Sequence, residues 1–198
     1  MTDERMAPVK DDIPLPLHEL ISQVLAPEQS TLQLASSVFP ALGTMQRLNQ
    51  QLVRRPVADF INAILRGIGQ VVFVNNPLSG LLILVALTIQ SPWMALMSML
   101  GLLSSTLTAI WLKLDRAAIR NGIFGYNGIL VGAALAIFGL PGNGGWHPGW
   151  AIAVIIFAAC TTILMKTMGM WLVTRFKVPP LTLPYNLVTL FFLGYLIV

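Results

Sequence analysis

The sequence has 198 residues, of which 56% are apolar and only 10% are charged, and its mean hydropathy is +0.75. A soluble domain has about a quarter of its residues charged, so this composition excludes an ordinary soluble protein and predicts an all-α integral membrane protein. The net charge of +4 comes without interleaved aromatic and basic residues, so no nucleic-acid partner is predicted.

The first part of the chain is more polar than the rest. Residues 1–50 contain several prolines and most of the acidic residues, and we expect them to form a cytoplasmic N-terminal tail with one amphipathic helix near 31–52. The acidic start MTDERMAPVKDD does not resemble a cleavable signal peptide. The transmembrane domain is expected over residues 51–198 and implies a lipid bilayer as its surroundings.

A half-length apolar segment opens this domain. The run 57–74 contains an acid, an asparagine, an arginine and Gln70, and it therefore makes a poor simple span. It ends at QVVFVNNPLSG, where two asparagines and a proline precede the next apolar run. We expect one half-spanning, re-entrant helix here, broken structurally at Asn75, Asn76 and Pro77.

Five apolar segments after this break are expected to be transmembrane helices, because a span needs about 20 apolar residues. They are separated by the turn signal QSP, the charged loop KLDRAAIRNG, the Gly/Pro loop PGNGGWHPG and the segment KVPPLTLPYN. The expected spans are residues 78–93, 92–112, 123–140, 150–176 and 187–198.

Basic residues alternate between successive connections. Lysine and arginine precede the first full span and follow the second and fourth spans, whereas the loops at 90–92 and 141–149 contain neither. This alternation predicts a cytoplasmic N-terminus, and five spans then place the C-terminus on the opposite side.

Three interruptions adjoin the apolar runs: GQVVFVNNP, NGIFGYNG and PPLTLP. Irregular backbone at membrane depth is tolerated where it is buried in protein or lines an aqueous cavity. A helix ending before Pro77 would free carbonyls near 70–74, Gln70 adds a side-chain carbonyl, and Thr182 offers a hydroxyl in a stiff extended segment. Because these groups are neutral and lie beside aromatic residues, they favour a small uncharged solute with N–H donors over an ion.

Several motifs, in order over residues 57–195, resemble the first half of the urea transporter family: VFVNNPLSGLLIL, QSPWMAL, STLTA, DRAAIRNGIFGYNGILVG and PPLTLPYN. The resemblance implies passive, channel-like transport of urea across a plasma or bacterial inner membrane by a homo-oligomer, a trimer in the family. It also implies that this chain is one inverted-repeat unit, with five transmembrane helices and one half-spanning helix.

The resemblance further implies five substrate-binding residues. Gln70 is similar to the family's glutamine at the pore mouth, and Phe73 and Tyr126 are similar to aromatic residues that line a flat slot. Leu130 resembles the apolar residue that narrows the slot, and Thr182 resembles the hydroxyl at the middle of a ladder of oxygens. Asn75 and Asn76 are similar to a pair of asparagines in the family, and we expect them to hold the ends of the two helices at the break.

Members of that family carry a second half of opposite orientation, whereas this sequence stops at Val198 after one. Two copies inserted in opposite orientations could complete a slot, although the alternation of basic residues opposes dual insertion. A truncated, non-conducting fragment is therefore an alternative hypothesis. A pore for another small neutral solute, such as short amides, ammonia or water, is a further alternative.

The sequence predicts neither an enzyme nor a cofactor or metal site. Its spans contain no Ser/His set and no paired acids of the kind that catalysis uses. His147 has no histidine or cysteine nearby to share a metal, and Cys160 lies in an apolar run where we expect it to pack as a small hydrophobic residue.

Overall fold

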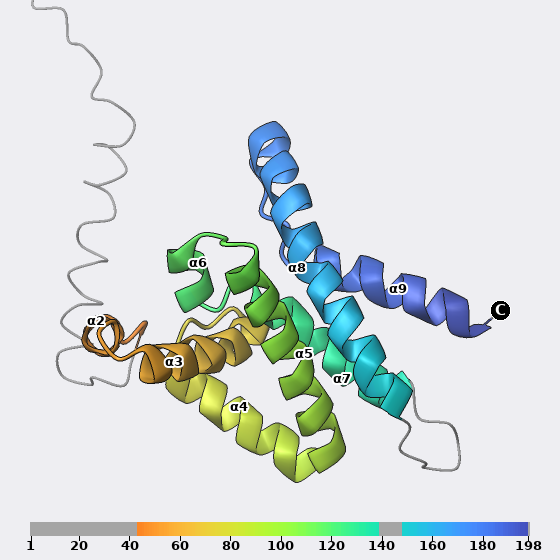
Figure 1. Ribbon diagram of the computed structural model, residues 1–198, viewed down its shortest axis with the longest axis horizontal. Helices are drawn as coiled ribbons and strands as arrows, with labels where there is room; N and C mark the ends of the chain where they lie inside the picture. The colour runs from red at the N-terminus through yellow and green to blue at the C-terminus, as the bar shows by residue number, and fades with distance from the viewer. Residues whose placement is uncertain (1–42, 139–147, 198) are drawn as a thin grey trace, which may run out of the picture. The chain divides into compact units, whose positions relative to one another are not determined.

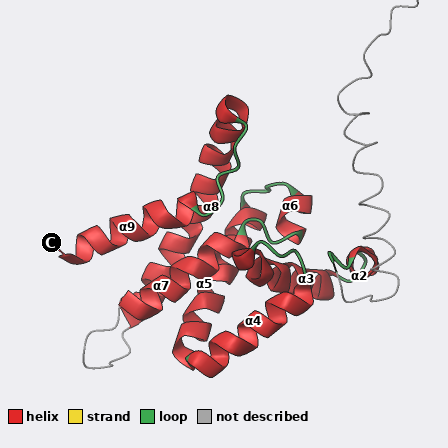
Figure 2. Cartoon of the chain, turned by 180° about the vertical axis from the view of Figure 1, so that it is seen from behind, coloured by secondary structure: helices red, strands yellow, loops and turns green. Residues whose placement is uncertain are grey.

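The computed structural model describes residues 43–138 and 148–197, which belong to one compact unit (Figure 1). This part of the chain consists of helices and loops without a strand, which confirms the all-α prediction (Figure 2). The helices are α2 (Gln46–Leu52), α3 (Pro56–Gly69), η1 (Gln70–Val72), α4 (Pro77–Gln90), α5 (Pro92–Trp111), α6 (Arg116–Arg120), α7 (Gly125–Phe138), α8 (Pro148–Phe176) and α9 (Leu183–Ile197). Most of the predicted tail lies outside the described residues, and α2 covers the end of the amphipathic helix expected near 31–52.

Two described helices are long and apolar enough to cross a membrane, namely α5 with 20 residues and α8 with 29. The segments Pro56–Val72 and Pro77–Gln90 pass the same test only when taken together, and they are bent by 75° at the break between them. The helices α7 and α9 are apolar but shorter. The membrane character is therefore confirmed, whereas the count of five spans stays a prediction.

Proline and small polar residues begin the helices where the sequence predicted breaks. Pro77 and Pro92 each occupy the first turn of a helix, where the missing N–H costs nothing. Ser91 ends α4 and also caps α5, because its hydroxyl accepts the backbone N–H of Met94. The segment 113–122, which the sequence predicts as a loop, contains the short helix α6, and Asp115 caps this helix by accepting the N–H of Ala118.

Glycines bring α5 and α7 into backbone contact. A Cβ added at Gly101 would lie 2.1 Å from the carbonyl oxygen of Gly128, and one added at Gly132 would lie 2.1 Å from that of Met97. Real side chains do not approach so closely, so only glycine fits at these crossings. Close approach of helices through small residues is a common way for membrane helices to associate.

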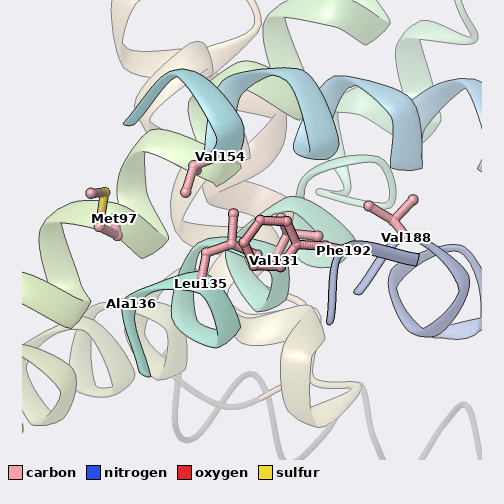
Figure 3. Close-up of a cluster of buried hydrophobic side chains, with 7 residues drawn as sticks. All are labelled: Met97, Val131, Leu135, Ala136, Val154, Val188 and Phe192. Atoms are coloured by element: carbon pink, nitrogen blue, oxygen red, sulfur yellow. The ribbon is translucent and has the colours of Figure 1, made fainter. Parts of the chain in front are cut away.

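A cluster of buried side chains joins four helices, α5, α7, α8 and α9 (Figure 3). In this cluster, Phe192 of α9 packs edge-on against Trp150 and Phe157 of α8, with ring centroids 5.7 and 5.3 Å apart. Aromatic pairs in this geometry add to the energy of burial. The buried members are Met97 of α5, Val131, Leu135 and Ala136 of α7, Val154 of α8, and Val188 and Phe192 of α9.

Candidate functional site

The predicted break between α3 and α4 is present in the structure. The helix α3 tightens into the 3₁₀ turn η1, and Phe73 then takes a left-handed conformation with φ 58°. Asn76 is extended and begins α4, with Pro77 as its first residue. A non-glycine residue in the left-handed region ends a helix abruptly, so the chain turns by 75° within a few residues.

The carbonyls of this break are less free than the sequence predicted. The N–H of Phe73 donates to the Gln70 carbonyl at 2.9 Å, and the N–H of Asn76 donates to the Val74 carbonyl at 3.0 Å. The tight turn brings these groups together, because the chain satisfies its own backbone where it leaves a helix. The expectation of free acceptors across residues 70–74 is therefore wrong for Gln70 and Val74.

The break is held by Arg66, the arginine that makes the run 57–74 a poor simple span and that also contributes to the alternation of basic residues. Its side chain is 1% exposed. Its Nη1 donates to the backbone and side-chain oxygens of Asn75 at 3.1 and 2.7 Å, its Nη2 donates to the Thr44 carbonyl at 2.7 Å, and its Nε donates to Asn62. The signal was available, because an arginine inside an apolar run must find partners within the protein.

The two asparagines of the break have different structural tasks. Asn76 caps α4, since its side-chain oxygen accepts the N–H groups of Leu78 and Ser79, and its amide donates to the Gly43 carbonyl. The amide of Asn75 donates to the side-chain oxygen of Asn121 at 3.2 Å. These contacts give a physical basis to the prediction that the pair holds the helix ends.

Gln70 lies at the end of α3, and its Nε2 donates to the backbone carbonyl of Asn121 at 3.0 Å. The carbonyl of the side chain is thereby oriented, because one end of the amide is fixed. The ring of Phe73 is 62% exposed. Phe73 therefore lies on the surface of the break, and Gln70 beside it is half-buried.

Thr182 lies in a turn between α8 and α9 and not in the extended segment that the prolines suggested. Leu181 before it is left-handed, with φ 45°, and the carbonyl of Thr182 accepts the N–H of Asn186 in α9. Its side chain is partly buried. Flanking prolines constrain φ but leave the residue between them free to turn, which the sequence pattern did not reveal.

The start of α7 holds this turn through two side chains. The hydroxyl of Tyr126 and the amide of Asn127 both donate to the carbonyl of Leu181, and the side-chain oxygen of Asn127 accepts the N–H of Tyr185. Tyr126 is 5% exposed and Asn127 is 1% exposed. Tyr126 is thus a buried anchor of the turn in this structure. Leu130 follows one helical turn later and is partly buried.

Residues 121–127 therefore connect both candidate segments. Asn121 binds the end of α3 through Gln70, and Tyr126 and Asn127 bind the turn that carries Thr182. The sequence did not predict this role for Asn121 or Asn127, because hydrogen bonds between residues more than fifty positions apart leave no local pattern. No hydrogen bond joins Gln70 to Thr182 within the part of the chain that the structure describes.

Metal ligands do not gather within the described residues: no group of three or more His, Cys, Asp or Glu side chains is suitably placed there. His147 lies outside this part of the chain. Cys160 is a free, partly buried thiol on α8, beside the cluster that joins α8 to α9.

Comparisons with a family model and with individual proteins point to the same family. The family model described as urea transporter matches residues 61–196, a region that contains every predicted site residue. Urea transporter 1 of Mus musculus is 41% identical over 146 residues, which are 73% of this chain and 37% of the mouse protein. The proteins of the same name from Ovis aries and Rattus norvegicus are 40% and 41% identical over the same length.

The aligned part spans 37% of the length of these relatives. The match agrees with the prediction of a membrane transport protein rather than an enzyme. A family model that covers residues 61–196 accounts for nearly all of the described helices. The chain belongs to the urea transporter family.

Proposed function

We propose that this chain forms one wall of a passive, channel-like path for urea across a cell membrane, with a cytoplasmic N-terminus. Membership of the urea transporter family supports urea as the solute. The solute-facing residues in this proposal are Gln70, Phe73, Tyr126, Leu130 and Thr182. The plasma or bacterial inner membrane is the proposed location, and a homo-oligomer is the proposed assembly.

The observation that carries the proposal is the common attachment of two interruptions to residues 121–127. The break after α3 supplies the oriented amide of Gln70, and the turn before α9 supplies the hydroxyl of Thr182. Irregular backbone beside apolar helices is typical of solute paths in membrane proteins. Asn121 holds the first segment and the first turn of α7 holds the second, and this shared attachment supports the proposal that both segments line one wall.

The chemistry of this wall suits urea. Urea is neutral and flat, and its N–H groups need acceptors once water is removed, because an unpaired polar group in an apolar site costs about 1–3 kcal/mol. The side-chain carbonyl of Gln70 and the hydroxyl of Thr182 are such acceptors. The exposed ring of Phe73 offers a flat apolar face that would not replace the hydration shell of an ion.

Surface composition supports a location within lipid. The outward faces of α4, α8 and α9 carry large apolar side chains, including Leu82 at 70% exposure and Phe191 at 73%. In water such a surface would aggregate, whereas hydrocarbon chains cover it at no cost.

Stopped-flow measurement of urea flux into proteoliposomes that contain this chain tests the proposal. We expect flux above that of empty liposomes, and we expect Gln70→Ala and Thr182→Val to reduce it. The matched controls are Gln90→Ala and Thr88→Val, because both residues are exposed on α4 and the Thr88 hydroxyl donates to its own helix at Leu84.

The outcomes separate the hypotheses. Absence of flux above empty liposomes would overturn the channel and favour a non-conducting chain. Flux of water or ammonia without urea flux would favour a less selective pore. Equal losses in the test variants and in the controls would remove Gln70 and Thr182 from the path.

A further inference from the structure

A small polar pocket lies beside the break, on the side where α2 meets α3. Its volume is about 260 Å³, and its lining includes Thr44, Asn49, Arg66 and Asn121. Every lining residue is polar, which is unusual in a chain of this hydropathy. Gln70 and Thr182 do not line this pocket.

The charge of Arg66 is not neutralised within this network. All four hydrogen bonds of its guanidinium go to neutral oxygens, on Asn62, Asn75 and Thr44. Asp59, the acid of the network, accepts Nε of Arg120 through both carboxylate oxygens at 2.8 and 3.0 Å. That pair is the one ion pair within residues 43–138 and 148–197. Two guanidinium groups thus face a single carboxylate, and one positive charge is left over.

The same network engages the side-chain oxygens of the three asparagines that line the pocket and leaves some of their N–H groups without a protein acceptor. The side-chain oxygen of Asn49 accepts from Asn62 and from Arg120. The side-chain oxygen of Asn75 accepts from Arg66, and that of Asn121 accepts from Asn75. The Nδ2 groups of Asn49 and Asn121 donate to no protein atom within the described ranges, and neither does one of the five N–H groups of Arg66.

We propose that this pocket binds one small monovalent anion of the kind represented by chloride and bicarbonate. Directed N–H donors and one positive charge without a counter-charge are the features that bind anions. Gln46 and Gln50 also line the pocket and keep their amide oxygens, so the charge of Arg66 is the feature that favours an anion over a neutral amide. A single negative charge balances the cluster of Asp59, Arg66 and Arg120. A buried charge without a partner is costly, so occupancy stabilises the folded state.

Thermal unfolding of the purified chain in detergent, followed by tryptophan fluorescence, tests this site without urea. The salt is sodium chloride or sodium bicarbonate, and sodium gluconate at equal ionic strength is the bulky reference. At ten times the dissociation constant, the melting temperature is expected to rise by about 3–5 °C over gluconate. Equal melting temperatures in all three salts would overturn the proposal.

A carboxylate built into the pocket should replace the anion. Gln46 lines the pocket and is exposed, so Gln46→Glu is expected to raise the melting temperature in gluconate and to abolish the response to chloride. Gln51→Glu makes the same charge change at an exposed position outside the pocket lining and should retain the full response. Loss of the response in both variants would show a general electrostatic effect and contradict a specific site.

Discussion

The hydroxyl of Tyr126 donates a hydrogen bond to the backbone carbonyl of Leu181, which lies 55 residues later in the chain. Asn127 donates to the same carbonyl at 3.3 Å, so two adjacent side chains of α7 hold one left-handed residue. The next residue is Thr182. The conformation of the turn that presents the Thr182 hydroxyl therefore depends on the first turn of α7 and not only on the flanking prolines.

Removing the Tyr126 hydroxyl should loosen this turn. Tyr126→Phe is expected to cost about 0.5–1.5 kcal/mol of stability, because the Leu181 carbonyl keeps its bond from Asn127. Asn127→Ala should cost about 1–3 kcal/mol of stability, since it also leaves the backbone N–H of Tyr185 without its acceptor. Chemical unfolding in detergent measures both. Tyr185→Phe is the control. If it lowered the stability as much as Tyr126→Phe does, the hydrogen bond from Tyr126 to Leu181 would contribute no more than the loss of any tyrosine hydroxyl.

Arg66 should not be replaceable by lysine. A lysine ammonium cannot reproduce the planar geometry that reaches Asn62, Asn75 and Thr44 together, so Arg66→Lys is expected to destabilise the chain by about 2–4 kcal/mol. Arg55→Lys is the matched change at an exposed position and should stay within about 0.5 kcal/mol. Thermal unfolding compares the two, and equal stabilities would mean that Arg66 does not hold the break.

The packing of α4 on α3 requires a glycine at position 80. A Cβ there would lie 1.8 Å from the carbonyl oxygen of Leu65, so Gly80→Ala must separate the helices and should cost about 1–3 kcal/mol or more. Gly194→Ala meets nothing within 4 Å and should be neutral or stabilising by up to about 1 kcal/mol. Yield of folded protein and melting temperature give the readout. A well-folded Gly80→Ala variant would show that α3 and α4 do not pack so closely.

The ion pair of Asp59 with Arg120 ties α3 to α6. Asp59→Asn should cost about 1–3 kcal/mol, because the side chain of Arg120 is only 20% exposed and loses its counter-charge. Asp115→Asn is the isosteric control, since asparagine caps a helix about as well as aspartate. In urea or guanidinium titrations the double variant Asp59→Asn with Arg120→Gln should lose less than the sum of the single variants; strict additivity would argue against a coupled pair.

Sequence patterns predicted the elements of this fold well. The break at Asn75, Asn76 and Pro77 is where the apolar run meets residues that cap and start helices. The long apolar runs at 92–112 and 150–176 became α5 and α8 within a few residues. The five-span count and the pore roles of Gln70, Phe73, Tyr126, Leu130 and Thr182 stay predictions.

Long-range polar contacts were not predictable in the same way. The residues next to Arg66 in the sequence do not identify its partners, since Thr44 precedes it by 22 positions and Asn75 follows it by nine. Tyr126 was expected to line a slot, and the structure shows its hydroxyl engaged with a distant carbonyl. Residue types show that such groups need partners, but they do not show which partners the fold supplies.

By itself, the sequence determined that the chain is helical and membrane-embedded, where its helices break, and which family it resembles, because hydropathy and capping preferences act over neighbouring residues. Only the tertiary structure decided that the break and the Thr182 turn share residues 121–127 as their anchor, and that a buried arginine lines a pocket of polar side chains. Those arrangements depend on hydrogen bonds across the fold, whose geometry is set when the glycine-lined helices close on one another.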